Sequence, residues 1–167
     1  MKLADAKNKF IQAWGTLGSE WGINRTMAQI HALLLISPEA LSAEDIMEQL
    51  SISRGNTNMN LRSLMDWGIV YKELVQGERR EFFVAEKDIL KVARQITKER
   101  RKRELEPVLK LFTELNELEG GSKAEIEEFK KVTGDIKDLT LRVDDLLEKF
   151  SKSDENWFYK ILVQMMK

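Results

Sequence analysis

The segment from Ser53 to Asp66 carries side chains that suit contact with the edges of DNA bases. Drawn as a helix that turns by about 100° per residue, it has an apolar side made of Thr57, Leu61, Leu64 and Met65. The opposite side carries Gly55, Asn56, Met59, Arg62 and Ser63, with Asn60 on its flank. Asn and Arg can pair bidentately with adenine and guanine in the major groove, and a methionine can contact a thymine methyl group. Ser53 is a suitable N-cap, and Arg54 follows it.

Each of these residues has a plainer explanation when it is taken alone. Asn56 and Asn60 suit any polar surface, and Arg54 and Arg62 can pair with Asp66 or neighbouring acids. The combination is what favours DNA, because a solvated helix face normally carries pairs of Glu and Lys. Gly55 lets the backbone approach a phosphate near the helix N-terminus, where the amides point.

A second basic group follows in a β-rich stretch. Short strands around Tyr71 and Phe83 flank the turn at Gly77, and they place Lys72, Arg79 and Arg80 near the tip of a hairpin. Two helices at a tight turn followed by a hairpin form a winged helix-turn-helix. We expect Gly77, Arg79 and Arg80 to contact DNA, with a solvated hairpin tip as the alternative.

The sequence lacks the residues that catalytic triads, metal sites and phosphate-binding loops need. The chain has 1 histidine, His31, and 0 cysteines, so a His-based triad, a multi-His metal site and a zinc finger are excluded. No glycine-rich phosphate loop is present, and Asp144-Asp145 falls on the polar face of a long helix. We expect no enzyme activity and no cofactor. His31 lies on an apolar segment and is expected to be a satisfied histidine in the interior or at its edge, with a pH sensor as the alternative.

Composition is consistent with a helical DNA-binding protein. The 167 residues hold 27 basic and 28 acidic side chains, a net charge of −1, with 2 Pro and 9 Gly. That balance excludes a polycationic coat on nucleic acid. No apolar stretch approaches the roughly 20 residues of a membrane span, and residues 1–9 do not resemble an export signal.

The hydrophobic periodicity predicts mainly α structure with a small β-hairpin. Helices are expected at 3–17, 25–36, 43–50 and 53–66, the first with Leu3, Phe10, Ala13, Trp14 and Leu17 on its apolar face. Residues 1–86 then form the DNA-binding domain, and residues 87–167 form a helical dimerisation region. In that region, Pro107 kinks or starts a helix, Ser122 caps a helix running to Phe150, and a last helix follows Ser153.

Apolar stripes in the second region have two interpretations. Along the long helix, residues recur at spacings of three and four: Ile126, Phe129, Thr133, Ile136, Leu139, Val143, Leu146 and Phe150. Such a stripe can pack on the first domain of the same chain, but its periodicity favours a dimerisation bundle. The basic run 98–103 contains Glu99 and precedes Glu104 and Glu106, so ion pairs are its expected use, ahead of phosphate contact.

The sequence resembles the MarR-type winged-helix transcription regulators, most closely their GbsR branch. The resemblance rests on Met59-Asn60-Leu61-Arg62 followed by Trp67-Gly68, and it covers about the first two-thirds of the chain. Thr57 and Asn58 depart from it, because valine and serine are common there. It implies a cytoplasmic, homodimeric regulator, usually a repressor, that binds double-stranded DNA with residues 53–66 and a wing at residues 76–80.

Relatives in the GbsR branch respond to choline or related molecules through aromatic side chains. Trp14, Trp21, Trp67 and Tyr71 are the main candidates for a small-molecule effector site here, with Trp157 and Tyr159 besides, because quaternary ammonium ions bind in aromatic cages. Core packing is the alternative for Trp14 and Trp67. For the chain as a whole, the alternative to a DNA-binding regulator is a winged helix used only for protein interaction.

Overall fold

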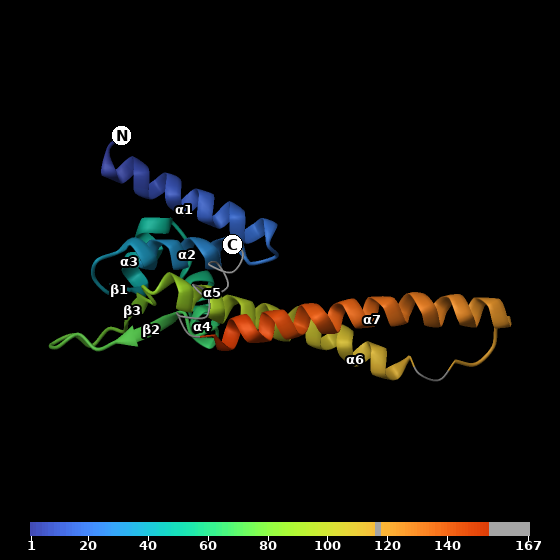
Figure 1. Ribbon diagram of the computed structural model, residues 1–167. Coiled ribbons are helices and arrows are strands. Elements are labelled where there is room, and N and C mark those ends of the chain that lie inside the picture. The colour runs from blue at the N-terminus through green and yellow to red at the C-terminus, as the bar shows by residue number, and fades with distance from the viewer. Residues whose placement is uncertain (116–117, 154–167) are drawn as a thin grey trace, which may run out of the picture. The chain divides into compact units, whose positions relative to one another are not determined.

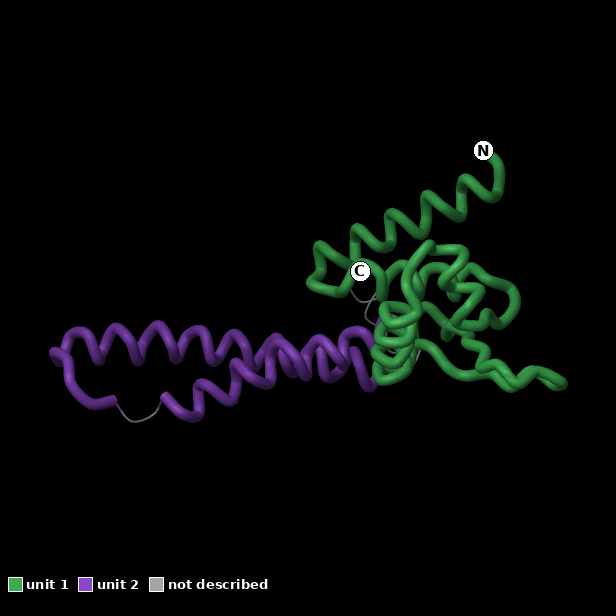
Figure 2. The backbone as a smooth tube through the Cα atoms, turned by 180° about the vertical axis from the view of Figure 1, so that it is seen from behind, with its two compact units in different colours: residues 1–92 green, residues 93–167 purple. Residues whose placement is uncertain are grey.

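The computed structural model describes residues 1–115 and 118–153. The chain divides into two compact units, Met1–Val92 and Ala93–Lys167 (Figure 2). Most of the described residues are helical, and a small antiparallel sheet lies in the first unit. This confirms the predicted fold class, mainly α with a β-hairpin.

The first unit has the element order of a winged helix-turn-helix (Figure 1). Its elements are α1 (Leu3–Glu20), α2 (Arg25–Ile36), β1 (Leu41–Ser42), α3 (Ala43–Leu50), α4 (Arg54–Asp66), β2 (Val70–Glu73), β3 (Phe82–Ala85) and the start of α5 (Ile89–Arg100). The strand order is β1-β3-β2, with Leu41 opposite Phe83 and Val70 opposite Ala85. The sequence did not predict β1, because two residues give no periodicity.

Helix α2 lies at the centre of the first unit and contacts α1, α3, α4 and β3. Ile30 and Leu34 of α2 are fully buried, as are Leu61 and Leu64 of α4. The carbonyl groups at the C-terminal end of α2 accept hydrogen bonds from a side chain outside the helix. Lys87 Nζ donates hydrogen bonds to the carbonyls of Leu34, Leu35 and Ser37 at 2.7, 2.8 and 2.8 Å. A cation there satisfies carbonyls that have no partner within the helix.

The contact of α1 with α2 depends on glycine. Ile11, Gly15 and Gly18 are the buried residues of α1, whereas Leu3 is exposed and so is Ala13. The helix itself is confirmed, and Phe10, Trp14 and Leu17 of its predicted apolar face are half-buried, but the prediction was wrong for Leu3 and Ala13. A Cβ atom on Gly18 would lie 2.6 Å from Ala28 Cβ, which is too close for two carbons. The absence of side chains thus brings the two backbones together, a signal that hydrophobic periodicity does not contain.

We predict that Gly18→Ala destabilises the protein although alanine favours helix. Overlap with Ala28 outweighs the gain in helix propensity of about 1 kcal/mol. Gly134→Ala is the matched control, because open space surrounds Gly134 within α7. Thermal unfolding is expected to occur at a lower temperature for Gly18→Ala and at an unchanged or higher temperature for Gly134→Ala. Equal shifts in the same direction would contradict the close packing of α1.

His31 is interior, but it is not satisfied as the sequence analysis expected. Its side chain is 2% exposed, and Nε2 has no hydrogen-bond partner among the described residues. Burial, aided by the positive charge of Lys87, lowers the pKa of His31 from 6.5 to about 4. The Trp14 ring lies 6.3 Å from the imidazole, centroid to centroid. The fold therefore holds this histidine neutral.

A neutral His31 has a direct test, since one histidine gives one imidazole spectrum. In an NMR titration we expect its midpoint near pH 4. The unfolded chain takes up this proton first as the pH falls below 6.5, so the contribution of His31 to stability declines between pH 6.5 and about 4. A midpoint near 6.5 in the folded protein would show that the imidazole is solvated.

The second unit is a helical hairpin (Figure 2). Its segments are the end of α5, a π-helical segment η1 (Arg101–Leu105), α6 (Glu106–Glu114) and α7 (Lys123–Lys152). Pro107 is near the start of α6, where its missing N–H is harmless. Ser122 caps α7 in a capping box with Glu125, as the sequence predicted in part. The helix expected after Ser153, with Trp157 and Tyr159, lies outside the described residues.

An ion pair joins η1 to α7 within this hairpin. Arg101 binds Asp144 of α7 with two hydrogen bonds, Nε to Oδ1 at 2.5 Å and Nη2 to Oδ2 at 2.9 Å. Arg100 pairs with Glu104 one turn later. Arg100 and Arg101 thus have the ion-pair use predicted for the basic run.

None of the helices in the described part of the chain is long and apolar enough to cross a membrane.

Candidate nucleic-acid interface

The turn between α3 and α4 fixes the direction of α4. Ser42 and Asp45 form a capping box at the start of α3, and hydrogen bonds from the Ser42 hydroxyl and amide lower the pKa of Asp45. At the other end of α3, Ser51 adopts a left-handed conformation with φ of 53°. The Ser53 hydroxyl then accepts a hydrogen bond from the Asn56 amide at 3.4 Å and begins α4.

One side of α4 is anchored and the other is open. Thr57, Asn60, Leu61 and Leu64 are buried, and the Thr57 hydroxyl donates to the Ser53 carbonyl at 3.0 Å. The residues of α4 that remain exposed are Arg54, Gly55, Asn58, Met59, Arg62 and Asp66, while Asn56 and Ser63 are half-buried. Met59 is the apolar exception on the open side, 57% exposed. The predicted division of the helix into two sides is therefore observed for most of its residues.

Asn60 lies on the buried side of α4, so its predicted position was wrong. It is 3% exposed and faces the interior, not the flank of the open side. Its Nδ2 donates to the Asn56 backbone carbonyl at 2.8 Å and to Asn56 Oδ1 at 2.7 Å. Burial on a helix requires such satisfaction of the amide, and the wheel alone could not show it. Asn60 is therefore a positioning residue for Asn56, whose own Nδ2 lies 3.5 Å from Thr26 Oγ1 in α2.

The two arginines of α4 differ in their surroundings. Arg54 pairs with Glu44 of α3 at 3.1 Å, an exposed ion pair of small energetic weight. Arg62 forms no ion pair with Asp66 or with any other acid in residues 1–115 and 118–153. The alternative explanation, pairing with a neighbouring acid, thus applies to Arg54 and not to Arg62.

Asn58 is the residue that the sequence analysis missed. It is exposed beside Arg62 and Gly55, and the helical wheel contains this information, because residues 58 and 62 are one turn apart. Asp66 is exposed at the end of the same side, so the open side carries one acid at its C-terminal end. The N-terminal two-thirds of the open side, from Arg54 to Arg62, has none.

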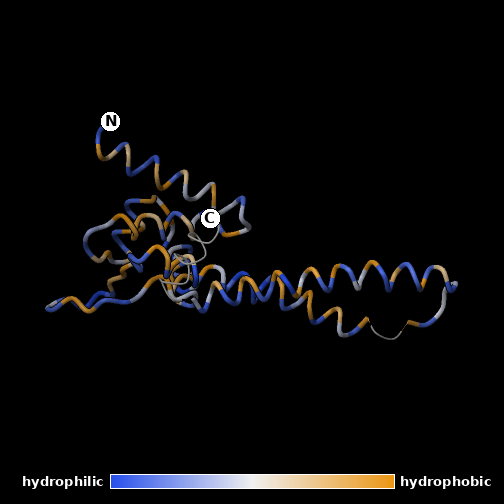
Figure 3. The backbone as a smooth tube through the Cα atoms, in the orientation of Figure 1, coloured by the Kyte–Doolittle hydropathy of each residue, from blue (hydrophilic) through white to orange (hydrophobic). Residues whose placement is uncertain are grey.

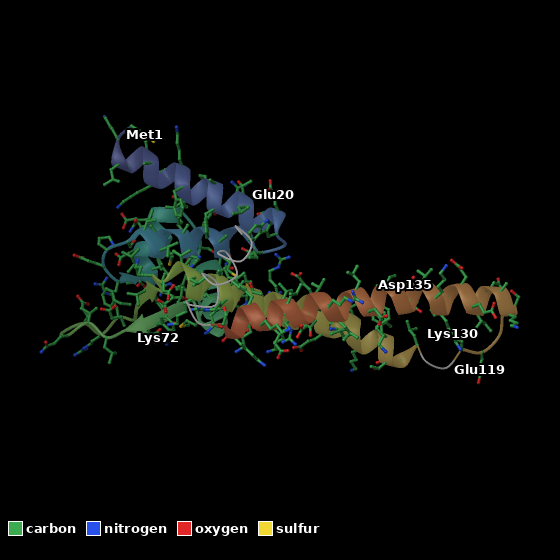
Figure 4. All side chains as sticks on the ribbon, viewed as in Figure 1. Met1, Glu20, Lys72, Glu119, Lys130 and Asp135 are labelled. Atoms are coloured by element: carbon green, nitrogen blue, oxygen red, sulfur yellow. The ribbon has the colours of Figure 1, made fainter. Side chains whose placement is uncertain are left out.

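The hairpin forms as predicted, with most of its tip charges paired. Gly77 has a φ of 85°, a conformation that suits glycine, and the Glu78 amide donates to the Val75 carbonyl at 3.1 Å. Lys72 pairs with Glu81, and Arg80 pairs with Glu78 at 3.3 Å while lying over the Phe82 ring. Arg79 is exposed and has no ion-pair partner in the described part of the chain. Lys72, in β2 of this hairpin, is labelled in Figure 4.

The four aromatic candidates for an effector site have differing environments. Trp67 is buried, Trp21 is exposed, and Trp14 is half-buried against Phe10 and His31. The Tyr71 hydroxyl donates to the Gly68 carbonyl at 2.8 Å, and Lys91 already lies over its ring at 5.7 Å. Effector binding at these residues stays a prediction.

In the described ranges, no group of three or more His, Asp and Glu side chains is placed so that it could hold a metal ion.

Comparison with known proteins agrees with this geometry. Residues 21–81, from the end of α1 to the wing, match the model of the MarR family. The winged helix of this chain therefore resembles that of the MarR family. That confirms the resemblance predicted from residues 59–68.

Similarity to individual proteins extends beyond the winged helix. The chain is 24% identical over 144 residues to the HTH-type transcriptional repressor GbsR of Bacillus subtilis, covering 84% of this chain and 75% of the relative. A solved structure described as a transcriptional regulator shares the fold with a TM-score of 0.62 and 17% identity, over 87% of this chain and 95% of that one. A mutant of S. aureus MepR bound to an oligodeoxyribonucleotide aligns with a TM-score of 0.41 and 16% identity, over 86% and 92% of the two chains.

The two asparagines of α4 give a matched test of which side is anchored. Asn60→Ala removes a buried donor and leaves the Asn56 carbonyl and Oδ1 without it, so we expect a loss of about 1–2 kcal/mol in unfolding free energy. Asn58→Ala makes the same chemical change on the exposed side and is expected to stay within about 0.5 kcal/mol of the wild type. Chemical denaturation measures both. Equal losses would mean that the side of α4 facing the interior is misassigned.

Proposed function

We propose that this chain is a transcriptional regulator that binds double-stranded DNA sequence-specifically as a homodimer, and that it represses from an inverted-repeat operator. The observation that carries the proposal is the open side of α4, where Arg62 lies beside Asn58 and Met59 without an acidic partner among the described residues. A solvated helix face normally carries pairs of Glu and Lys, and the open side of α4 carries Asn, Met and Arg in their place. GbsR, a repressor by name, supports the direction of regulation.

In this proposal α4 enters the major groove and the wing contacts the backbone. Arg62 reads guanine, Asn58 and Asn56 read adenine, and Met59 contacts a thymine methyl group. Ser53, Arg54 and Gly55 lie where the first amides of α4 approach a phosphate, since those N–H groups point out of the helix end. Ser63 donates to the Met59 carbonyl at 3.2 Å and lines the same side. Gly77, Arg79 and Arg80 add contacts to phosphate or to the minor groove.

Charge sets the conditions under which binding occurs. With a net charge of −1, the protein has little general attraction to the DNA backbone, so binding depends on a matched operator and weakens with salt. A homodimer places two α4 helices into successive major grooves, about 34 Å apart. The operator is then an inverted repeat whose half-site centres are one helical turn apart.

The decisive experiment is in vitro selection of random double-stranded DNA with the purified protein, followed by affinity measurements at two salt concentrations. An enriched inverted repeat that is bound less tightly at the higher salt concentration supports the proposal. If no sequence is enriched and binding is absent or indifferent to sequence, the chain is better explained as a protein-interaction module built on a winged helix.

Two arginine variants separate base reading from phosphate contact on the selected operator. Arg62→Ala is expected to weaken binding by 1–3 kcal/mol and to relax the preference at one base pair. Arg79→Ala is expected to weaken binding to all sequences alike and to lower the salt dependence by about one counterion. Lys123→Ala, at the start of α7, removes an exposed positive charge elsewhere and serves as the control. Unchanged affinity and base preference for Arg62→Ala would refute the assignment of α4.

A further inference from the structure

Helix α7 exposes most of its large apolar residues, and none of its residues is fully buried. Six large apolar residues of α7 are exposed on one stripe: Phe129, Val132, Ile136, Leu139, Val143 and Leu146. Leu139 is 63% exposed and Leu146 is 62% exposed. Figure 3 shows apolar positions recurring along the helix. An uninterrupted apolar stripe of this length on a surface indicates an interaction site.

The side of α7 that is already packed has a different character. Its half-buried residues include Thr133, Lys137, Thr140, Asp144 and Leu147, and Asp144 binds Arg101 of η1. Within the second unit, the side of α7 toward η1 and α6 thus combines polar residues with Leu147. The more apolar stripe is left for another partner.

The spacing of the stripe identifies the kind of partner. The six residues alternate steps of three and four, from 129 to 132, 136, 139, 143 and 146. This is the a and d pattern of a coiled coil, in which another helix packs along the stripe. Leu141 is also exposed but falls outside the pattern.

The charges beside the stripe indicate the direction of that helix. The a positions are Phe129, Ile136, Val143 and, continuing the pattern, the half-buried Phe150. The residues that directly precede them are Glu128, Asp135, Arg142 and Lys149, so the edge is acidic in its first half and basic in its second. In an antiparallel pair of identical helices this edge faces itself, and Glu128 meets the partner's Lys149 while Asp135 meets the partner's Arg142. In a parallel pair the edge faces the e positions, which here are the uncharged Thr133, Thr140 and Leu147.

These charges are available for such pairing. Among the described residues, no ion pair holds Glu128, Asp135 or Arg142, and Lys149 pairs only with Asp145 of its own helix, an exposed pair. Figure 4 labels Asp135 on α7. The apolar layers agree with the same alignment: Phe129 lies level with the partner's Leu146, Val132 with the partner's Val143, and Ile136 with the partner's Leu139.

We propose that the stripe on α7 is the seam of an antiparallel coiled coil with α7 of a second copy of this chain. The occupant is a second copy because the charged edge is complementary to itself when reversed. The inference rests on the homodimer of the proposed function and adds to it the surface, the direction and the register.

Cysteine cross-linking tests direction and register, because the natural chain has 0 cysteines. Phe129→Cys and Leu146→Cys are prepared separately, mixed and oxidised. We expect a disulfide only between the two different variants. In the antiparallel register two copies of residue 129 lie about 25 Å apart along the axis, beyond the reach of a disulfide. Disulfides formed within each variant alone would show a parallel pair and overturn the proposal.

Charge reversal tests the self-complementary edge. Glu128→Lys with Asp135→Lys makes the edge basic throughout, and Arg142→Glu with Lys149→Glu makes it acidic throughout. We expect each variant to dimerise at least about tenfold more weakly than the wild type, and an equimolar mixture to recover as a heterodimer. If each of the two variants, measured alone, dimerises as strongly as the wild type, the antiparallel assignment is overturned.

Two leucines form a matched pair for the seam itself. Leu139→Asp and Leu141→Asp introduce the same charge on the same helix, once within the stripe and once outside it. By analytical ultracentrifugation we expect Leu139→Asp to weaken dimerisation at least about 100-fold and Leu141→Asp to leave it close to wild type. Circular dichroism of both variants shows whether α7 still forms.

The failure of this inference differs from the failure of the proposed function. If Leu139→Asp remains a dimer and binds the selected inverted repeat as the wild type does, the seam is refuted and the DNA-binding homodimer stands. If the wild type is a monomer at every concentration at which it binds a single half-site, the homodimer and the seam fail together.

Discussion

The packing of α2 against its neighbours is the constraint on which the first unit depends. A helix that is apolar on nearly every side must be covered on nearly every side, and α1, α3, α4 and β3 all contact it. Two of these elements have unusual residues at the contact. Helix α1 packs with Gly15 and Gly18, which have no side chains, and α4 buries the polar Thr57 and Asn60 beside Leu61 and Leu64. The position of α4 on this base is what leaves its other side open.

The ends of α2 are as important as its sides. Asn24 caps the first turn through the Met27 amide at 3.1 Å, and Thr26 lies within reach of Asn56 in α4. At the other end, the ammonium group of Lys87 closes the last carbonyls. Lys87, two residues after β3, therefore contacts the same helix as α4, so the end of the wing and α4 are both joined to α2.

The sequence predicted what depends on local patterns and missed what depends on contact. Caps at Ser53 and Ser122, the glycine turn at Gly77 and the helix over residues 54–66 follow from short-range rules, and all are present. The burial of Asn60, the exposure of Leu3, the pairing of β1 and the unpaired Nε2 of His31 depend on which surfaces meet. Periodicity marks an apolar face but not a glycine contact, and a wheel gives an angle but not the boundary of the core.

The hydrogen bonds from Asn60 to Asn56 have a thermodynamic consequence. A side chain that is free in solution loses rotational entropy when it is fixed against a partner, and a long arginine loses more than an asparagine. Asn56 is already held by Asn60 and lies beside Thr26, so its side chain has lost much of that freedom within the folded chain. The Arg62 side chain is exposed and keeps more of its freedom. In the proposed complex with DNA, fixing Arg62 therefore costs more side-chain entropy than fixing Asn56.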